Sequence, residues 1–380
     1  MINILYVYGD ILRYGGMEIH MMNYFRNIDR KKIHIDFVVQ TDGTQKGVFD
    51  DEIIASGSTI YYLPKMKTHP FKNYYGILKI LGSKKYQIIH AHSDAMNYRY
   101  LKMAGFLKIP VRISHSHNTH HVLNNKVKYR YYEFCRKNIF RYATKCFACS
   151  NLAGRWMYHN HPFEVIPNAI CLDKFKYNST VSCDLRSKYG IADNEIVLGN
   201  VGRFDYQKNQ EFLIEIIKEL KDEAVSYKLL MIGDGWKINE IKRLVDENEL
   251  EEKVIFVGNV DTPQDYYNMM DVFLLPSRFE GFPLVLIEAQ ANGLKCIVSD
   301  HVTKEVNQTG QVRFCPLDSS KWVDTIKNEK LDRSDGSIKK LTYNGYEITH
   351  AAKALSERYI QLYKEAVNKK HRRLRKKHNG

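Results

Sequence analysis

Two glutamates spaced eight residues apart are the side chains best placed for chemistry. Glu280 and Glu288 lie in the segment PSRFEGFPLVLIEAQANG, residues 276–293. This segment predicts a strand end, a short loop and a helix, because Pro283 suits the first turn of a helix and Gly293 suits its C-cap. Peptide N–H groups at such a helix start have no partner within the helix and form an anion site. Two carboxylates beside an anion site suit a ligand with hydroxyl groups at both ends and phosphates between them.

Glu288 has apolar neighbours, Leu286, Ile287 and Ala289, which predict a mostly buried helix. A lone buried carboxylate is costly, so a bound partner is expected for it. The alternative is that Glu288 is simply a good helix former on a hydrated face.

A second candidate group is the pair of cations in VGRFDYQKN, residues 201–209. Arg203 is expected to end a strand and Lys208 to open the next helix, where the helix dipole opposes a positive charge. An anion shared by both cations would make Lys208 tolerable there. The alternative is an ordinary surface arginine and lysine.

These segments together resemble the retaining glycosyltransferases of the GT-B fold, and especially family 4, as found in capsule and exopolysaccharide synthesis. The Glu280/Glu288 spacing is similar to that family's E-x7-E motif, and VGRFDYQKN resembles its diphosphate-binding Arg/Lys pair. IGDG (232–235) resembles the nucleotide-side loop, VIPNAICLDKF the interdomain linker, and Gly15-Gly16 the N-terminal glycine loop.

The resemblance implies a role for each matching residue. Glu288 should bind the ribose hydroxyls of a nucleoside-diphosphate sugar, and Glu280 the hydroxyls of the transferred sugar. Glu280, Arg203, Lys208 and His117 are therefore the expected catalytic residues. The full expected donor-binding set is Gly16, Arg203, Lys208, Gly233, Glu280, Gly281, Phe282, Pro283, Leu284 and Glu288.

The chemistry of such a transfer places negative charge on the departing diphosphate, which must be stabilised. No D-x-D pair sits in a plausible loop to hold a metal ion, so we expect no metal and no cofactor. A double displacement needs a carboxylate beside the anomeric carbon, and none is apparent on the acceptor side. The resemblance implies instead a same-face displacement in which the departing phosphate takes the acceptor's proton.

Histidines crowd the segment RISHSHNTHH, which follows a predicted strand with His115, His117, His120 and His121. Imidazoles there could orient an acceptor hydroxyl. The resemblance implies a histidine at this strand end, and we expect it to be His117, with His115 and Asn118 beside it on the acceptor side. A metal held by this cluster is the weaker rival, because no carboxylate or cysteine lies next to it.

The elements that must position these groups alternate between short apolar runs and helix-length segments. Such alternation predicts parallel sheets covered on both faces. We expect two doubly wound α/β domains, residues 1–170 for the acceptor and 171–349 for the donor, with 350–380 packing back on the first. Ligands should bind beyond the carboxyl ends of the strands, in the cleft between the domains. The predicted strands are residues 3–9, 34–40, 59–64, 87–93, 111–117 and 145–150, then 196–202, 227–235, 254–260, 272–277 and 295–300.

Composition excludes several other classes of protein. The 380 residues are 44% hydrophobic and 26% charged, which excludes wholesale disorder. No apolar run is long enough to span a membrane and the N-terminus lacks a secretion signal, so we expect a cytoplasmic protein. Seven cysteines are an odd, scattered set, which favours reduced thiols.

The net charge of +14 is concentrated in residues 1–175 and in the tail NKKHRRLRKKHNG, whereas residues 176–360 are mildly acidic. Residues 126–143, KVKYRYYEFCRKNIFRYA, alternate cations with aromatic rings, which suits the headgroup layer of a bilayer. The alternative is an amphipathic helix packed on the core with a hydrated basic face.

The leading hypothesis is a metal-independent retaining transferase that moves a hexose from a nucleoside diphosphate to a glycan or polyprenyl-linked acceptor. Its basic surface suits peripheral attachment at the inner face of an anionic membrane. An epimerase or phosphorylase of the same fold is an alternative. A basic nucleic-acid-binding protein is disfavoured, because it leaves Glu280, Glu288, Arg203 and Lys208 unexplained, and we expect no nucleic-acid partner.

Overall fold

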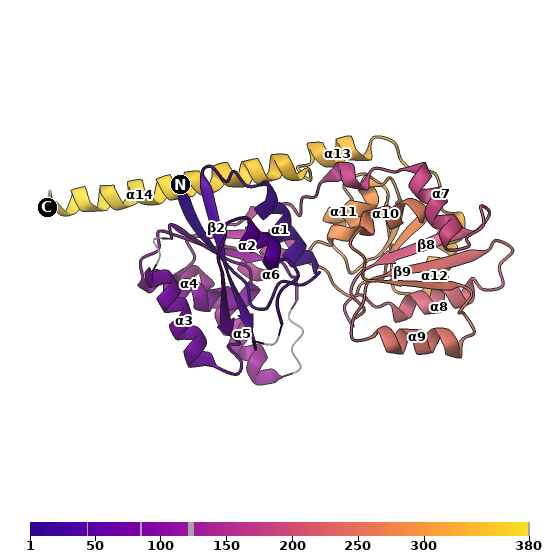
Figure 1. The fold of residues 1–380 in the computed structure, drawn as a ribbon, viewed down its shortest axis with the longest axis horizontal. Helices are drawn as coiled ribbons and strands as arrows, with labels where there is room; N and C mark the ends of the chain where they lie inside the picture. Colours follow the sequence, from indigo (N-terminus) through magenta and orange to yellow (C-terminus); the bar gives the residue numbers. More distant parts are fainter. Residues whose placement is uncertain (44, 84–85, 121–124, 379–380) are drawn as a thin grey trace. The chain divides into compact units, whose positions relative to one another are not determined.

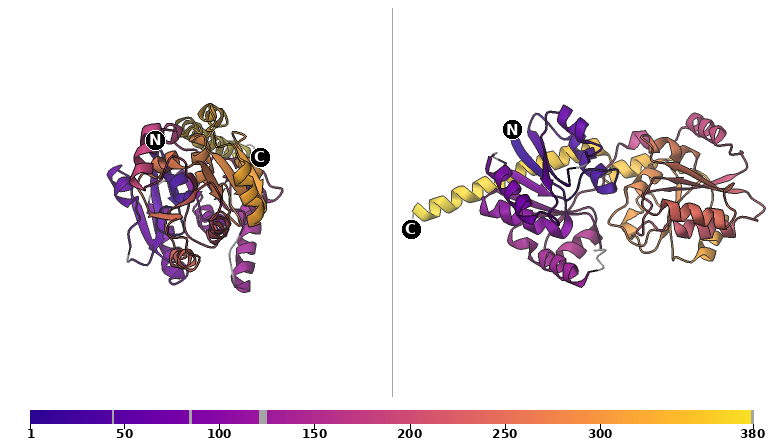
Figure 2. Two further views of the ribbon diagram at one scale, coloured as in Figure 1. Left: turned by 90° about the vertical axis from the view of Figure 1, so that its right-hand side faces the viewer. Right: turned by 60° about the horizontal axis from the view of Figure 1, so that its bottom comes forward.

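The computed structural model describes residues 1–43, 45–83, 86–120 and 125–378. The chain forms two compact units (Figures 1 and 2). The first unit joins Met1–Asn168 to the C-terminal segment that begins at Ile348, and the second comprises Ala169–Glu347.

The first unit is built on a seven-stranded sheet in the order β3-β2-β1-β4-β5-β6-β7. Every neighbouring pair in this sheet is parallel. The order reverses direction between β1 and β4, which makes the carboxyl ends of these two strands the switch point where such sheets bind ligands. The strands are β1 (Ile2–Val7), β2 (Ile33–Thr41), β3 (Ile60–Pro64), β4 (Ile88–Ala91), β5 (Val111–Ser116), β6 (Lys145–Ala148) and β7 (Glu164–Val165).

Helices cover this sheet, and the longest of them comes from the far end of the chain. Helix α14 (Ile348–His378) runs beside α1 (Gly16–Asn27) in the first unit (Figure 1). Ser356 on α14 accepts a hydrogen bond from the Asp29 amide, and the hydroxyl groups of Tyr359 and Tyr6 lie 2.9 Å apart. The other helices are α2 (Asp50–Ala55), α3 (Pro70–Ser83), α4 (Asn97–Phe106), α5 (Lys126–Asn138) and α6 (Asn151–Tyr158), with 3₁₀ turns η1 (Asp94–Met96) and η2 (Ile139–Arg141).

The second unit has a six-stranded parallel sheet in the order β10-β9-β8-β11-β12-β13, with its switch point between β8 and β11. Its strands are β8 (Ile196–Val201), β9 (Tyr227–Ile232), β10 (Val254–Gly258), β11 (Val272–Leu275), β12 (Lys295–Ser299) and β13 (Val312–Cys315). Its helices are α7 (Ser179–Lys188), α8 (Glu211–Glu219), α9 (Ile238–Glu247), α10 (Pro263–Tyr266), α11 (Leu284–Ala291), α12 (Ser319–Asn328) and α13 (Ser337–Tyr343), with 3₁₀ turns η3 (Leu172–Phe175), η4 (Tyr267–Met269) and η5 (Lys304–Val306).

The predicted fold class, two Rossmann-like parallel-sheet domains, is confirmed. One local prediction is wrong: Lys208 does not open a helix, because α8 begins at Glu211. Asn209 adopts the left-handed conformation, with φ of +58°, and this interrupts the chain between Lys208 and the helix. Lys208 therefore lies in a turn, where no helix dipole opposes its charge.

Two further sequence predictions can be compared with the structure. Within the described ranges, no helix combines the length and apolar character needed to cross a bilayer. All seven cysteines are free. The basic tail continues α14 as far as His378, and residues 379–380 lie outside the described part of the chain.

Candidate active site

A lysine–carboxylate pair joins the loops that follow β8 and β11, at the switch point of the second sheet. Lys208 Nζ lies 2.6 Å from Glu280 Oε1, and the side chains are 17% and 6% exposed. Glu280 Oε1 also accepts a hydrogen bond from Ser277 (2.8 Å), and its Oε2 accepts one from Gln207 (3.1 Å). Three donors thus fix the Glu280 carboxylate in one orientation. A lysine has three N–H donors, so Lys208 can serve Glu280 and a further anion together.

Arg203 lies in the same loop as Lys208, and Asp205 connects the two. The Arg203 Nε donates to Asp205 Oδ2 at 2.8 Å, while Asp205 Oδ1 accepts from the Lys208 amide at 3.1 Å. The Arg203 side chain is 64% exposed. The loop therefore presents one exposed cation, Arg203, and one largely buried cation, Lys208. A contact of both cations with a diphosphate stays a prediction.

Glu288 lies on α11, the helix that follows the Glu280 loop. The helix is apolar, since Leu284, Leu286, Ile287 and Ala289 are buried along with Glu288 itself. Burial raises the pKa of Glu288 to about 7, although a hydrogen bond from Tyr267 (2.6 Å to Oε2) and the charge of Lys208 act in the opposite direction. The carboxyl group therefore changes its charge near neutral pH, and the hydrated-face alternative for Glu288 is wrong.

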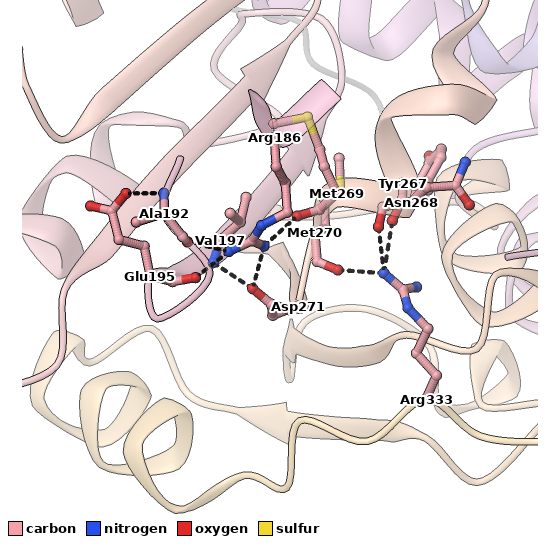
Figure 3. A network of polar contacts seen from close by, with 10 residues as sticks. All are labelled: Arg186, Ala192, Glu195, Val197, Tyr267, Asn268, Met269, Met270, Asp271 and Arg333. Carbon is pink, nitrogen blue, oxygen red and sulfur yellow. Dashed lines mark hydrogen bonds and ion pairs between the residues drawn. The ribbon is translucent and has the colours of Figure 1, made fainter. Parts of the chain in front are cut away.

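Tyr267 is held in place by a network that sequence reasoning did not predict (Figure 3). The Arg333 guanidinium donates to the carbonyl oxygens of Asn268 (2.9 Å) and Met270 (2.6 Å) and also to that of Tyr267 itself (3.3 Å). Asp271 then accepts from Arg186 at 3.2 Å and from the Val197 amide at 2.8 Å. Arg333 thus fixes the segment whose tyrosine orients Glu288.

The loop between Glu280 and α11 contributes its main chain rather than its side chains. Phe282 is 6% exposed and stacks on Tyr346 with ring centroids 5.6 Å apart, and Leu284 is 4% exposed. With Gly281 and Pro283, these residues leave peptide groups as the means of contacting a ligand. Pro283 is the N-cap of α11, so the loop leads directly into the positive end of the helix dipole.

The packing of the IGDG loop requires glycine at both of its glycine positions. Gly233 adopts φ of +126°, and a Cβ there would overlap the Gly202 carbonyl oxygen; a Cβ on Gly235 would overlap the Phe204 main chain. The Phe204 amide also donates to the Asp234 carbonyl at 3.0 Å. Close packing of this loop on the Arg203 loop therefore requires glycine, and a nucleotide contact by Gly233 stays a prediction.

Gly16 differs, because a Cβ there would meet no atom of the chain within 4 Å. It lies at the start of α1, after β1, at the switch point of the first sheet. No contact within the described chain demands glycine at this position, and a ligand contact by Gly16 stays a prediction.

The predicted acceptor side holds a cluster of five buried histidines: His20, His90, His92, His115 and His117. His117 is 8% exposed and His115 is fully buried. Burial lowers the pKa of all five rings, to about 3 for His20. A direct role for His117 in chemistry stays a prediction.

Asp94, in η1, is the carboxylate that sequence reasoning missed at this site. It accepts a hydrogen bond from the His117 amide (2.8 Å) and one from the Asn118 side chain (2.7 Å). Its position after β4 was the available signal, because β4 and β5 are parallel neighbours whose carboxyl ends meet. His120 is exposed, and His121 lies outside the described residues.

Two family models match the chain, one in each half. The model described as "Glycosyltransferase Family 4" matches residues 14–174, and that described as "Glycosyl transferases group 1" matches residues 182–327.

Sequence relatives cover most of the chain. EpsF of Bacillus subtilis (strain 168), named as a glycosyltransferase, is 32% identical over 326 residues, 82% of this chain and 84% of that one. The Staphylococcus aureus capsular polysaccharide biosynthesis glycosyltransferase CapH is 26% identical over 95% of this chain and 99% of its own length. The Escherichia coli UDP-Gal:alpha-D-GlcNAc-diphosphoundecaprenol alpha-1,3-galactosyltransferase is 25% identical over 75% of this chain and 76% of its own.

Among solved structures, Anabaena Alr3699/HepE in complex with UDP-glucose has the same fold. The TM-score is 0.71 at 15% identity, over 97% of this chain and 99% of that one.

Proposed function

We propose that this chain, which belongs to the glycosyltransferases of group 1 and family 4, is a retaining enzyme of cell-surface polysaccharide synthesis. It transfers a hexose from a nucleoside diphosphate to a glycan or polyprenyl-linked acceptor. The observation that carries the proposal is the Lys208–Glu280 pair at the β8/β11 switch point, with Glu288 on the adjoining helix. The names of CapH and of the Escherichia coli galactosyltransferase support the polysaccharide and the lipid-linked acceptor.

The proposed donor site divides the nucleotide sugar among these groups. Lys208 and Arg203 stabilise the charge that develops on the diphosphate, together with the peptide N–H groups that lead into α11. Glu280 accepts hydrogen bonds from hydroxyl groups of the transferred sugar, and Glu288 accepts them from the hydroxyl groups of the ribose. The bound UDP-glucose of the Anabaena protein supports a nucleoside-diphosphate hexose as the donor.

The two cations supply positive charge where the leaving group needs it, so we propose that transfer proceeds without an added metal ion. The reaction retains the configuration at the anomeric carbon, with the departing phosphate taking the acceptor's proton. Asn118, at the end of β5 and bonded to Asp94, lies on the acceptor side.

The test is thermal stabilisation and donor hydrolysis with a panel of uridine, guanosine and adenosine diphosphate sugars in the presence of EDTA. One donor should raise the melting temperature of the wild type and release free sugar slowly, and Glu288→Ala should lose both effects. If no nucleotide sugar raises the melting temperature, the proposed donor site is wrong. If donor hydrolysis stops in EDTA, the proposal that transfer needs no metal ion is wrong.

Removing the Tyr267 hydroxyl should make donor binding depend on pH. In Tyr267→Phe the pKa of Glu288 should rise above its value of about 7, because that hydrogen bond lowers it. We expect the KM for the donor at pH 7 to rise about tenfold, in line with a lost hydrogen bond to a charged group, with kcat little changed and the KM recovering at higher pH.

The matched control for this variant is Tyr266→Phe, in the same segment, whose hydroxyl contacts Tyr189 at 3.4 Å instead. A purely structural defect in Tyr267→Phe would raise the KM equally at every pH, and that outcome would reject the role of Tyr267 in tuning Glu288.

The acceptor proposal extends to a membrane surface, because α5 exposes apolar side chains beside cations. Val127 is 76% and Phe134 50% exposed, with Lys128 and Arg130 also on the surface, whereas Cys135 is buried against the unit. Rings and methyl groups among cations suit the interface of an anionic bilayer. We propose peripheral attachment through this face of α5.

Liposome flotation checks this attachment. The wild type should float with vesicles that contain anionic lipid, and Phe134→Ser combined with Lys128→Glu should reduce the floating fraction several-fold. Tyr343→Ser is the control, since this side chain is 91% exposed on α13 of the second unit. Equal flotation of both variants would contradict a membrane contact through α5.

A further inference from the structure

The histidine cluster of the first unit leaves three ring nitrogens buried without a hydrogen-bond partner among the described residues. They are His20 Nδ1, His92 Nε2 and His115 Nε2. Burying an unpaired polar atom costs free energy, so each such atom in a folded protein needs an explanation. Two of the three, His20 Nδ1 and His115 Nε2, belong to a group of rings whose nitrogens lie close together, and this indicates a ligand that imidazole nitrogens bind.

We propose that His20, His115 and His117 bind one transition-metal cation of the kind that imidazole suits, Cu⁺ or Zn²⁺. One ring nitrogen from each residue lies within 4.8 Å of the other two. The ring centroid of His20 lies 5.3 Å from that of His115 and 5.3 Å from that of His117. A tetrahedral zinc site with Zn–N distances of about 2.1 Å needs ligand nitrogens about 3.4 Å apart. The rings of His115 and His117 are stacked with centroids 4.2 Å apart, so they would have to rotate for their nitrogens to converge on the ion.

The other ring nitrogens are engaged as those of metal-binding histidines are. The second nitrogen of such a ligand is normally hydrogen-bonded to a neighbour that fixes the ring. His115 Nδ1 lies 3.2 Å from His90 Nε2, and His90 Nδ1 lies 2.6 Å from the Tyr359 hydroxyl. His117 Nε2 lies 3.0 Å from His92 Nδ1. The two ligands on the β5 side therefore each have an orienting partner.

The donor set also determines which cations fit. Metal binding requires neutral imidazoles, and burial keeps these rings neutral by lowering their pKa. Mg²⁺ and Ca²⁺ prefer oxygen ligands, whereas imidazole suits zinc and copper. Three neutral ligands leave the ionic charge uncompensated, which favours monovalent copper, or zinc with an anionic fourth ligand. In either case one nitrogen of His117 would bind the metal and the other would contact His92. The ring would then have no nitrogen left for the direct role in sugar transfer that the sequence predicts.

The test uses the full chain without an affinity tag, stripped with chelator and dialysed, and titrated with Zn²⁺, with Cu⁺ under reducing conditions and with Mg²⁺. We expect one equivalent of Zn²⁺ or Cu⁺ to bind and raise the melting temperature, and Mg²⁺ not to bind. His20→Leu and His117→Gln should each weaken the affinity at least tenfold. His69→Leu, which replaces an exposed histidine of the same unit, should bind like the wild type.

Three outcomes would overturn the inference: a folded wild type that binds neither ion, binding that the two cluster variants leave unchanged, or equal binding of Mg²⁺. If a cluster variant does not fold, X-ray absorption of the loaded wild type decides. Three imidazole ligands support the site, and a shell dominated by oxygen rejects it. The readout is bound metal, so its failure is distinct from failure of the proposed transferase activity.

Discussion

Replacing Lys208 with alanine is expected to lower the kcat of sugar transfer about 100- to 1,000-fold, which is the range seen when one preorganised donor to a developing charge is removed. Lys208 contacts Glu280 at 2.6 Å, so the same change removes the cation at the diphosphate and frees the carboxylate at the sugar. Arg203→Ala removes the second diphosphate cation and its contact with Asp205 but leaves the Lys208–Glu280 pair in place, because that side chain is 64% exposed. Steady-state kinetics with the donor identified by the panel measure both effects.

The control for Lys208→Ala must account for stability, because removing one partner of a buried ion pair costs about 3–5 kcal/mol. Glu280→Gln removes the other charge of the same ion pair, and its side chain has the same shape and can still interact with Ser277 and Gln207. Its free energy of unfolding, compared with that of Lys208→Ala, shows how much stability is lost with the ion pair. Lys218→Ala, on the exposed face of α8, should change neither fold nor rate. If Lys208→Ala and Arg203→Ala are both folded and both transfer sugar within tenfold of the wild-type rate, the proposed stabilisation of the diphosphate is wrong.

The sequence was a good guide to the strands because most of them are buried on both faces. Such strands appear as continuous apolar runs, and the predicted runs overlap β1 to β6 and β8 to β12. Two edge strands were missed for physical reasons. Strand β7 is only two residues long, and β13, VRFC, includes an exposed arginine, so neither has a run that distinguishes it from a loop.

The candidate site was predictable where its residues are close in sequence and unpredictable where the fold brings them together. Glu280 and Glu288 share one loop and helix, so their spacing carried the information. The partners of these carboxylates do not: Gln207 and Lys208 reach Glu280 from more than 70 positions away, and Tyr267 lies in a separate turn. His20 was missed for the same reason, since only the packing of α1 places it beside β5.

Acidification below about pH 6.5 is expected to unfold the first unit selectively. Its five buried histidines have pKa values lowered by burial, so the unfolded chain binds more protons than the folded one below the ordinary value of 6.5. Stability is therefore complete above that pH and is lost as the pH falls. Each ring that the fold keeps neutral removes about 1.4 kcal/mol per pH unit below that value, so several such rings together approach the whole stability of many domains.

The second unit provides an internal control, because its buried Glu288 titrates near neutral pH with the opposite sign. Glu288, with a pKa raised to about 7, binds its proton more tightly when folded, so this group adds stability as the pH falls towards 4.5. Hydrogen exchange measured by mass spectrometry, with chelator present, should show β4 and β5 losing protection between pH 6.5 and 5 while β8 and β11 keep theirs. His20→Leu should make the loss shallower by about one proton, and His69→Leu should not. Equal protection of the first unit at pH 7.5 and pH 5 would contradict this prediction. It would mean that the five rings can take up protons in the folded state, so their burial would not make the stability of the first unit depend on pH.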